Sequence, residues 1–126
     1  MRTIANRSLT SPNSGTIVLH FVANSTSNTE TINIVGNNSV SNVALNSEIV
    51  TAANITKVYY GVANGDLYWT VERGSNTVLV LNNSGFEDFE TYGNSLSLDN
   101  TANLTIKLNG NNPLGYMILE LRKITV

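Results

Sequence analysis

The chain lacks cysteine and contains a single histidine, His20, among its 126 residues. The absence of cysteine excludes a disulfide framework, a thiolate nucleophile and a cysteine-ligated metal site. One histidine is too few for a histidine-rich metal site, and no Gly-x-Ser-x-Gly motif of a serine hydrolase accompanies it. We therefore expect a protein that is not an enzyme, with no catalytic residues, metal or cofactor, and interpret His20 as a structural or surface side chain.

Charged residues and long apolar runs are also scarce. Seven Lys and Arg and nine Asp and Glu give a formal net charge of -2, which offers no basic surface for nucleic acid. No apolar run approaches the roughly 20 residues of a membrane span. The N-terminal residues 1–8 lack the apolar segment of a secretory signal. These features predict a protein that binds neither nucleic acid nor a membrane.

Small polar residues make up much of what is present: 20 Asn, 14 Thr and 12 Ser. A hydrophobic fraction of 41% nevertheless argues against general disorder. The length suits one domain. Residues 1–14 are polar and include Arg2, Arg7 and Pro12, which predicts an extended N-terminal arm, followed by a single domain over 15–126.

Short runs rich in Val, Ile, Leu, Tyr and Thr recur along the chain between Gly and Asn residues. They are mostly too short for helices, and their spacing is typical of antiparallel all-β domains. We predict an antiparallel β-sandwich or a jelly-roll-like barrel of about eight strands. One further segment, 84–92, is compatible with a helical turn or a loop. The expected strands are 16–23, 31–35, 55–62, 67–72, 77–82, 96–98, 104–108 and 116–124.

The pair Asn64-Gly65 lies between two of these runs, a strong short-range signal for a two-residue β-hairpin. It predicts that 57–62 pairs with 67–72, with Tyr60 opposite Trp69 on the core face. The same reasoning places Trp69 in the core rather than on a carbohydrate platform.

The next turn, 73–76, predicts that 77–82 continues this meander. Thr70 would then lie opposite Leu79, and Tyr68 opposite Leu81, on the outer face of the sheet. An apolar outer face needs a cover, which could come from this chain's own arm or a loop, from another subunit or partner, or from a ligand. The candidate interface residues are Tyr59, Tyr68, Thr70, Leu79 and Leu81, together with Arg2 and Arg7 of the arm.

Glu87, Asp88 and Glu90 form an acidic cluster. Paired carboxylates can bind calcium or serve in acid–base catalysis, but the spacing of an EF-hand loop is missing. We interpret the cluster as a solvated turn.

Three segments resemble small virion structural proteins of tailed bacteriophages, particularly phages of marine cyanobacteria. They are Arg2–Thr10 leading into Gly15–Phe21, the central Leu67–Gly74, and Leu119–Lys123 near the end. The resemblance implies a non-enzymatic capsid decoration or cement protein that binds and stabilises the phage head. A neck or tail component is the neighbouring role, and a carbohydrate-binding, lectin-like module is the alternative from the aromatic residues.

The resemblance also implies the partners and the location. The partners would be the major capsid protein or other virion subunits, and further copies of the chain, with a trimer favoured. The protein would be assembled in the host cytoplasm and reside in the virion. Scarce charge and strands that are apolar on both faces agree with a domain surrounded by neighbours.

Overall fold

A computed structural model describes residues 2–8, 14–21, 28–91 and 98–126, with residues 2–8 and Phe21 as backbone only. The described chain is all-β and contains no helix, which confirms the predicted antiparallel β-sandwich. Its nine strands are β1 (Arg2–Ser8), β2 (Ser14–Phe21), β3 (Thr29–Ile32), β4 (Val50–Val62), β5 (Tyr68–Arg73), β6 (Asn76–Asn82), β7 (Gly85–Asp88), β8 (Leu104–Asn109) and β9 (Gly115–Thr125).

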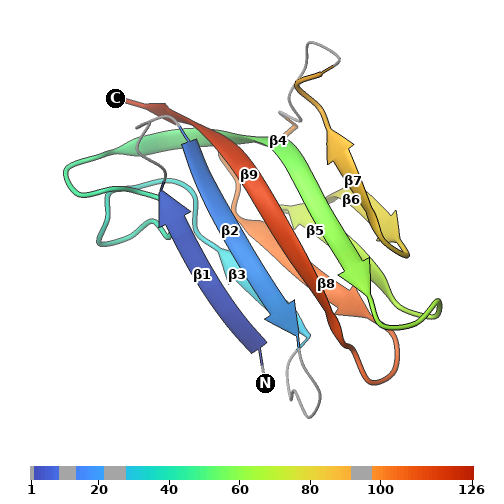
Figure 1. Ribbon diagram of the computed structural model, residues 1–126. Helices are drawn as coiled ribbons and strands as arrows, with labels where there is room; N and C mark the ends of the chain where they lie inside the picture. Colours follow the sequence, from blue (N-terminus) through green and yellow to red (C-terminus); the bar gives the residue numbers. More distant parts are fainter. Residues whose placement is uncertain (1, 9–13, 22–27, 92–97) are drawn as a thin grey trace.

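The strands form two antiparallel sheets that pack face to face. Sheet A has five strands in the order β1-β2-β9-β4-β7, and sheet B has four in the order β3-β8-β5-β6. Sheet A lies in front in Figure 1, with sheet B behind it. Buried aliphatic side chains from both sheets meet between them in one cluster that also contains Trp69.

Two segments of the chain have a different structure from the one that the sequence predicted. Residues 2–8, expected to be part of an extended arm, form the edge strand β1, which pairs with β2 along its whole length. Residues 85–88, expected to be a helical turn or a loop, form β7 at the other edge of the same sheet. The expected strand at 96–98 lies mostly outside the described residues, and Leu98 is not in a strand.

The predicted hairpin at Asn64-Gly65 is wrong. β4 belongs to sheet A and β5 to sheet B, so this turn carries the chain across the sandwich. Neither Asn64 nor Gly65 has the positive φ that a type I′ hairpin turn requires. Instead, the Asn64 side chain accepts a hydrogen bond from the Asp66 backbone N–H at 3.0 Å, and the Asn64 carbonyl accepts one from Leu67.

Trp69 is fully buried, as predicted. It is not the cross-strand partner of Tyr60, because the two residues lie in different sheets. Its indole Nε1 donates a hydrogen bond to the Gly61 carbonyl at 3.2 Å. Because Gly61 lies on β4 and Trp69 on β5, this bond joins the two sheets. A buried indole N–H needs such a partner, so Trp69 fixes how the sheets stack.

Two buried cations also connect separate parts of the sandwich. Arg73, at the end of β5, donates hydrogen bonds to the carbonyls of Ala53, Asn100 and Ala102. Burial lowers the pKa of Arg73, and the negative charge of Asp99 opposes that shift.

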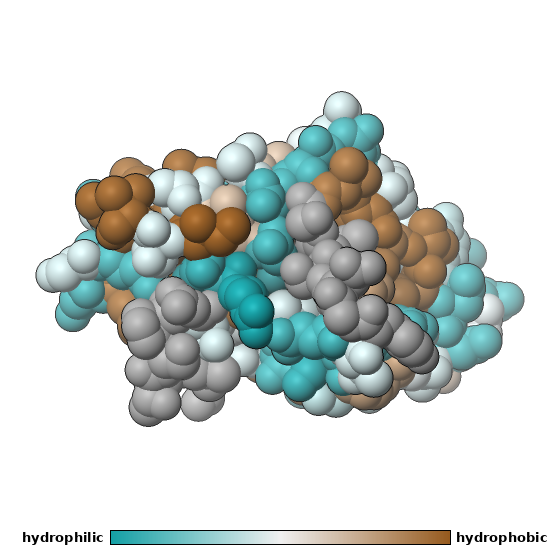
Figure 2. Space-filling model, turned by 90° about the horizontal axis from the view of Figure 1, so that it is seen from above, coloured by the Kyte–Doolittle hydropathy of each residue, from teal (hydrophilic) through white to brown (hydrophobic). Residues whose placement is uncertain are grey.

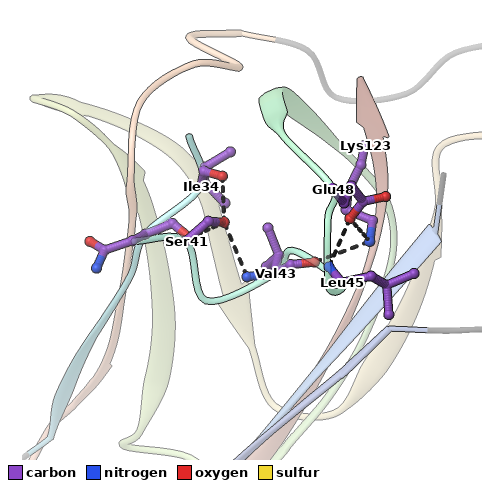
Figure 3. A network of polar contacts seen from close by, with 7 residues as sticks. Ile34, Ser41, Val43, Leu45, Glu48 and Lys123 are labelled. Carbon is purple, nitrogen blue, oxygen red and sulfur yellow. Dashed lines mark hydrogen bonds and ion pairs between the residues drawn. The ribbon is translucent and has the colours of Figure 1, made fainter. Parts of the chain in front are cut away.

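Lys123 on β9 is the second buried cation. It donates hydrogen bonds to the Val43 carbonyl at 3.0 Å and to Glu48 Oε1 at 2.8 Å. The same carboxylate oxygen accepts the Leu45 backbone N–H, while the Ser41 hydroxyl bridges Ile34 and Val43 (Figure 3). This network anchors the irregular 33–49 segment to β9.

Candidate functional site: the outer face of sheet A

The predicted interface residues do not share one surface. Tyr59 is on the outer face of sheet A, whereas Tyr68 and Thr70 are on β5 in sheet B. Tyr59 and Tyr68 are 37% and 39% exposed, so both reach solvent, on opposite sides of the sandwich. Leu81 is buried and Leu79 packs against the core.

A β-bulge in β6 explains why the leucines point inward. Val71 pairs with Leu79 and Glu72 pairs with Thr77, so Val78 is an extra residue in β6. A one-residue insertion moves every later side chain to the opposite face. Leu81 therefore pairs with Trp69 on the core side instead of with Tyr68 on the outer side.

The two arginines predicted for the interface lie in β1. Arg2 pairs with Phe21 and Arg7 with Thr16, both in the backbone register of the β1–β2 hairpin. Their side chains lie outside the described part of the chain.

The outer face of sheet A carries a row of apolar side chains that crosses four strands. The register places Val18 of β2 beside Ile118 of β9, Ile118 beside Tyr59 of β4, and Tyr59 beside Phe86 of β7. The Tyr59 and Phe86 rings stack with centroids 4.5 Å apart. Phe86 is 48% exposed. We call these four residues the apolar row.

Tyr116 extends this surface toward one end of the sheet. Its ring lies over Gly61, so closely that a Cβ at that position would come within 2.5 Å of the ring. The glycine thus creates the space into which the tyrosine folds, a common way to cover glycine in a sheet. Beside the ring is a shallow, mainly apolar depression whose lining includes Ala63, Ser84 and Leu114.

Polar and charged residues border the apolar row on the side opposite Tyr116. The register places Thr16 beside Glu120, Glu120 beside Lys57, and Lys57 beside Asp88. Farther out, Arg122 forms an ion pair with Glu90 at 2.5 Å. The outer face of sheet A therefore combines an apolar centre with a charged border, as protein interfaces do.

Elsewhere on the molecule, the exposed apolar side chains lie in separate places. Val35, Val40, Ile49 and Val126 are exposed in the β3–β4 connection and at the C-terminus. The end of the molecule that is uppermost in Figure 1 shows its hydrophobic residues in separate areas, with hydrophilic residues between them (Figure 2). The apolar row differs because the register of four adjacent strands makes it continuous.

The acidic cluster does not converge on one point. Asp88 points to the outer side with Lys57, whereas Glu87, its neighbour in β7, pairs with Val58. Glu90 contacts Arg122. Among the residues that the structure describes, no group of three His, Cys, Asp or Glu side chains is placed to hold a metal ion.

Asp88 accepts hydrogen bonds from both the hydroxyl and the backbone N–H of Thr91, which end β7 in a tight turn. The hydrogen bond from the Thr91 hydroxyl is the largest cause and lowers the pKa of Asp88. Burial opposes it, and the backbone hydrogen bonds and the charge of Lys57 add smaller lowering effects on the pKa. A lowered pKa means that these contacts stabilise the fold above the ordinary aspartate pKa, and that this contribution disappears as pH falls through the lowered value.

We expect Thr91→Val to raise the pKa of Asp88, because valine keeps the backbone N–H and removes the hydroxyl donor. An NMR titration of the Asp88 side chain measures this directly. Thr101→Val, at an exposed threonine in another loop, is the matched control and should leave the Asp88 titration unchanged. An Asp88 pKa that is equal in the wild type and in Thr91→Val would contradict the assignment.

Comparisons of the chain with protein-family models, with curated proteins and with solved structures give no match. Within the described segments, no helix has the length and apolar character required to cross a membrane.

Proposed function

We propose that this chain is a non-enzymatic virion structural protein that binds and stabilises the head of a tailed phage, as a capsid decoration or cement protein. The observation that supports the proposal is the apolar row on the outer face of sheet A. The exposed face of a two-layer sandwich is ordinarily polar, and a continuous exposed apolar surface marks a contact site. In this proposal the row packs against the capsid protein, and the polar residues beside it form the rim.

The fold suits such a role mechanically. The face is built on five paired strands and is backed by a core joined through Trp69, so it can dock without rearrangement. A decoration protein occurs in many copies on one particle. Individually weak contacts can then sum by avidity, provided that neighbouring copies are also linked.

The test is co-sedimentation with purified heads of tailed cyanobacterial phages. We expect the wild-type protein to sediment with the heads, and Tyr59→Ser with Phe86→Ser to reduce binding at least tenfold, because the double variant removes the stacked aromatic pair of the apolar row. The double variant should keep its fold, since both side chains are substantially exposed.

Tyr68→Ser is the matched control. Tyr68 has nearly the same exposure as Tyr59 but lies on the outer face of the other sheet, so its replacement should leave head binding unchanged. Equal loss in Tyr68→Ser would show that sheet A is not the contact. Failure of the wild-type protein to sediment with any head preparation would contradict the proposed function.

The lectin-like alternative has one specific observation in its favour. Tyr116 is 41% exposed and its ring lies over Gly61 beside the depression, an arrangement that could receive one sugar ring. By contrast, Tyr59 and Phe86 stack on each other and so do not form a flat platform. Binding to a glycan, with loss of that binding in Tyr116→Ala and no binding to heads, would favour the alternative over the proposal.

A further inference from the structure

The edge strand β6 differs from the other three edges of the two sheets. An edge strand exposes unpaired backbone N–H and C=O groups, and proteins commonly protect it with charged residues or by keeping it short. β1 contains two arginines, β3 is four residues long and contains Glu30, and β7 is four residues long with two acidic residues. β6 has seven residues and no charge.

The side chains of β6 are apolar on both faces. Leu79 and Leu81 point toward the core, where they pair with Val71 and Trp69. Val80, between them, points outward and is 57% exposed. The backbone edge of β6 has no strand partner among the described residues. This edge therefore offers backbone pairing and apolar contact at the same place.

The sequence of β6 is suited to pairing with itself. Leu79-Val80-Leu81 reads the same in both directions. In an antiparallel pair centred on Val80, the two Val80 residues lie opposite each other, and each Leu79 lies opposite Leu81 of the other copy. The leucine pairs place core-facing side chains beside core-facing ones, and the valine pair places outward-facing side chains together, as the alternation of strands requires.

The absence of charge in β6 permits a second copy of this chain as the partner. Around a two-fold axis, a charged residue near the centre meets the same charge in the other copy, and like charges directly opposite destabilise a strand pair. β6 is free of charge over its whole length, so self-pairing meets no such repulsion. The bulge at Val78 lies two residues from the axis, so the two-fold places one bulge on each side, opposite Asn82 of the other copy, and leaves the register from Leu79 to Leu81 regular across the axis.

We propose that β6 pairs antiparallel with β6 of a second copy across a two-fold axis at Val80, which joins the two B sheets into one continuous sheet. The interface is isologous, so it produces a dimer and closes. It leaves the outer face of each sheet A uncovered. This pairing goes beyond the proposed capsid role and is tested on the purified protein alone, so either proposal can fail without the other.

The test uses two opposite charges at the axis. Val80→Lys and Val80→Glu each place like charges opposite each other, so each variant alone should dissociate at least tenfold more readily than the wild type. An equimolar mixture of the two variants should restore the dimer, because lysine then faces glutamate. Sedimentation velocity over a range of concentrations measures the assembly state, and circular dichroism confirms that each variant is folded.

Val35→Lys is the matched control, because Val35 is 47% exposed and lies outside β6. It should form the same dimer as the wild type. Three results would each overturn the proposal: a wild-type protein that is monomeric or trimeric at all concentrations, single variants that assemble like the wild type, or a mixture that stays monomeric.

Discussion

Replacing Arg73 with alanine should destabilise the fold by about 3–5 kcal/mol. The guanidinium is buried and bonds three carbonyl oxygens, from β4 and from the segment before β8. Alanine leaves these acceptors without their cationic donor and opens a cavity where the long side chain packed. Such a loss is a large share of the 5–15 kcal/mol that typically stabilises a domain.

Denaturant unfolding followed by the fluorescence of Trp69, the only tryptophan, measures the effect. Arg73→Lys should also lose stability, because an ammonium group keeps the charge but lacks the planar fork that reaches three carbonyls. The control is Arg122→Ala, which removes an exposed ion pair and should cost no more than about 1 kcal/mol. A similarly small loss in Arg73→Ala would contradict the role given to Arg73.

Replacing Lys123 with methionine should cost about 3–5 kcal/mol, because it leaves the Glu48 carboxylate buried without its cation. The Lys123 and Glu48 side chains are 0% and 8% exposed, so water cannot replace the lost partner well. The Val43 carbonyl loses its donor in the same variant. We expect the 33–49 segment to loosen from β9, with faster amide hydrogen exchange at Leu45 than in the wild type.

A double-mutant cycle with Glu48→Gln isolates the ionic part of this contact. Glutamine removes the charge but keeps an oxygen that can accept the Leu45 N–H. Lys123→Met combined with Glu48→Gln should therefore be more stable than Lys123→Met alone. Strict additivity of the two single changes would mean that the pair is not coupled and would contradict this account.

Most of the strands could be predicted from the sequence because they carry the period-two alternation that a half-buried strand requires. The alternation in Leu104–Leu108 and in Met117–Leu121 appears in β8 and β9 as expected. β7 was missed because Gly85-Phe86-Glu87-Asp88 has no apolar run. Its edge position and its pairing with β4 make it a strand, and neither is visible locally.

The sequence could not determine which strands pair with each other, or in which register. The Asn64-Gly65 turn has the same local chemistry whether the chain returns to one sheet or crosses to the other, and strands of both sheets alternate alike. The bulge at Val78 leaves no mark in the residue pattern, yet it reverses the faces of Leu79 and Leu81. Together these two features divided the predicted interface between the core and two opposite surfaces.

The buried cations were missed for a related reason. Arg73 stands next to the Gly74 turn, and Lys123 follows Arg122 near the chain end, positions where exposed charge is the usual expectation. Their carbonyl partners come from segments distant in the chain, such as Ala53 for Arg73 and Val43 for Lys123. Only the assembled sandwich brings these groups together.

A cryo-electron microscopy map of phage heads incubated with the protein tests the central claim most directly, because it shows which face contacts the shell. We expect ordered density for the sandwich with the outer face of sheet A, including Tyr59 and Phe86, against the capsid protein. Density with sheet B and Tyr68 against the shell, or heads that carry no bound protein, would contradict it.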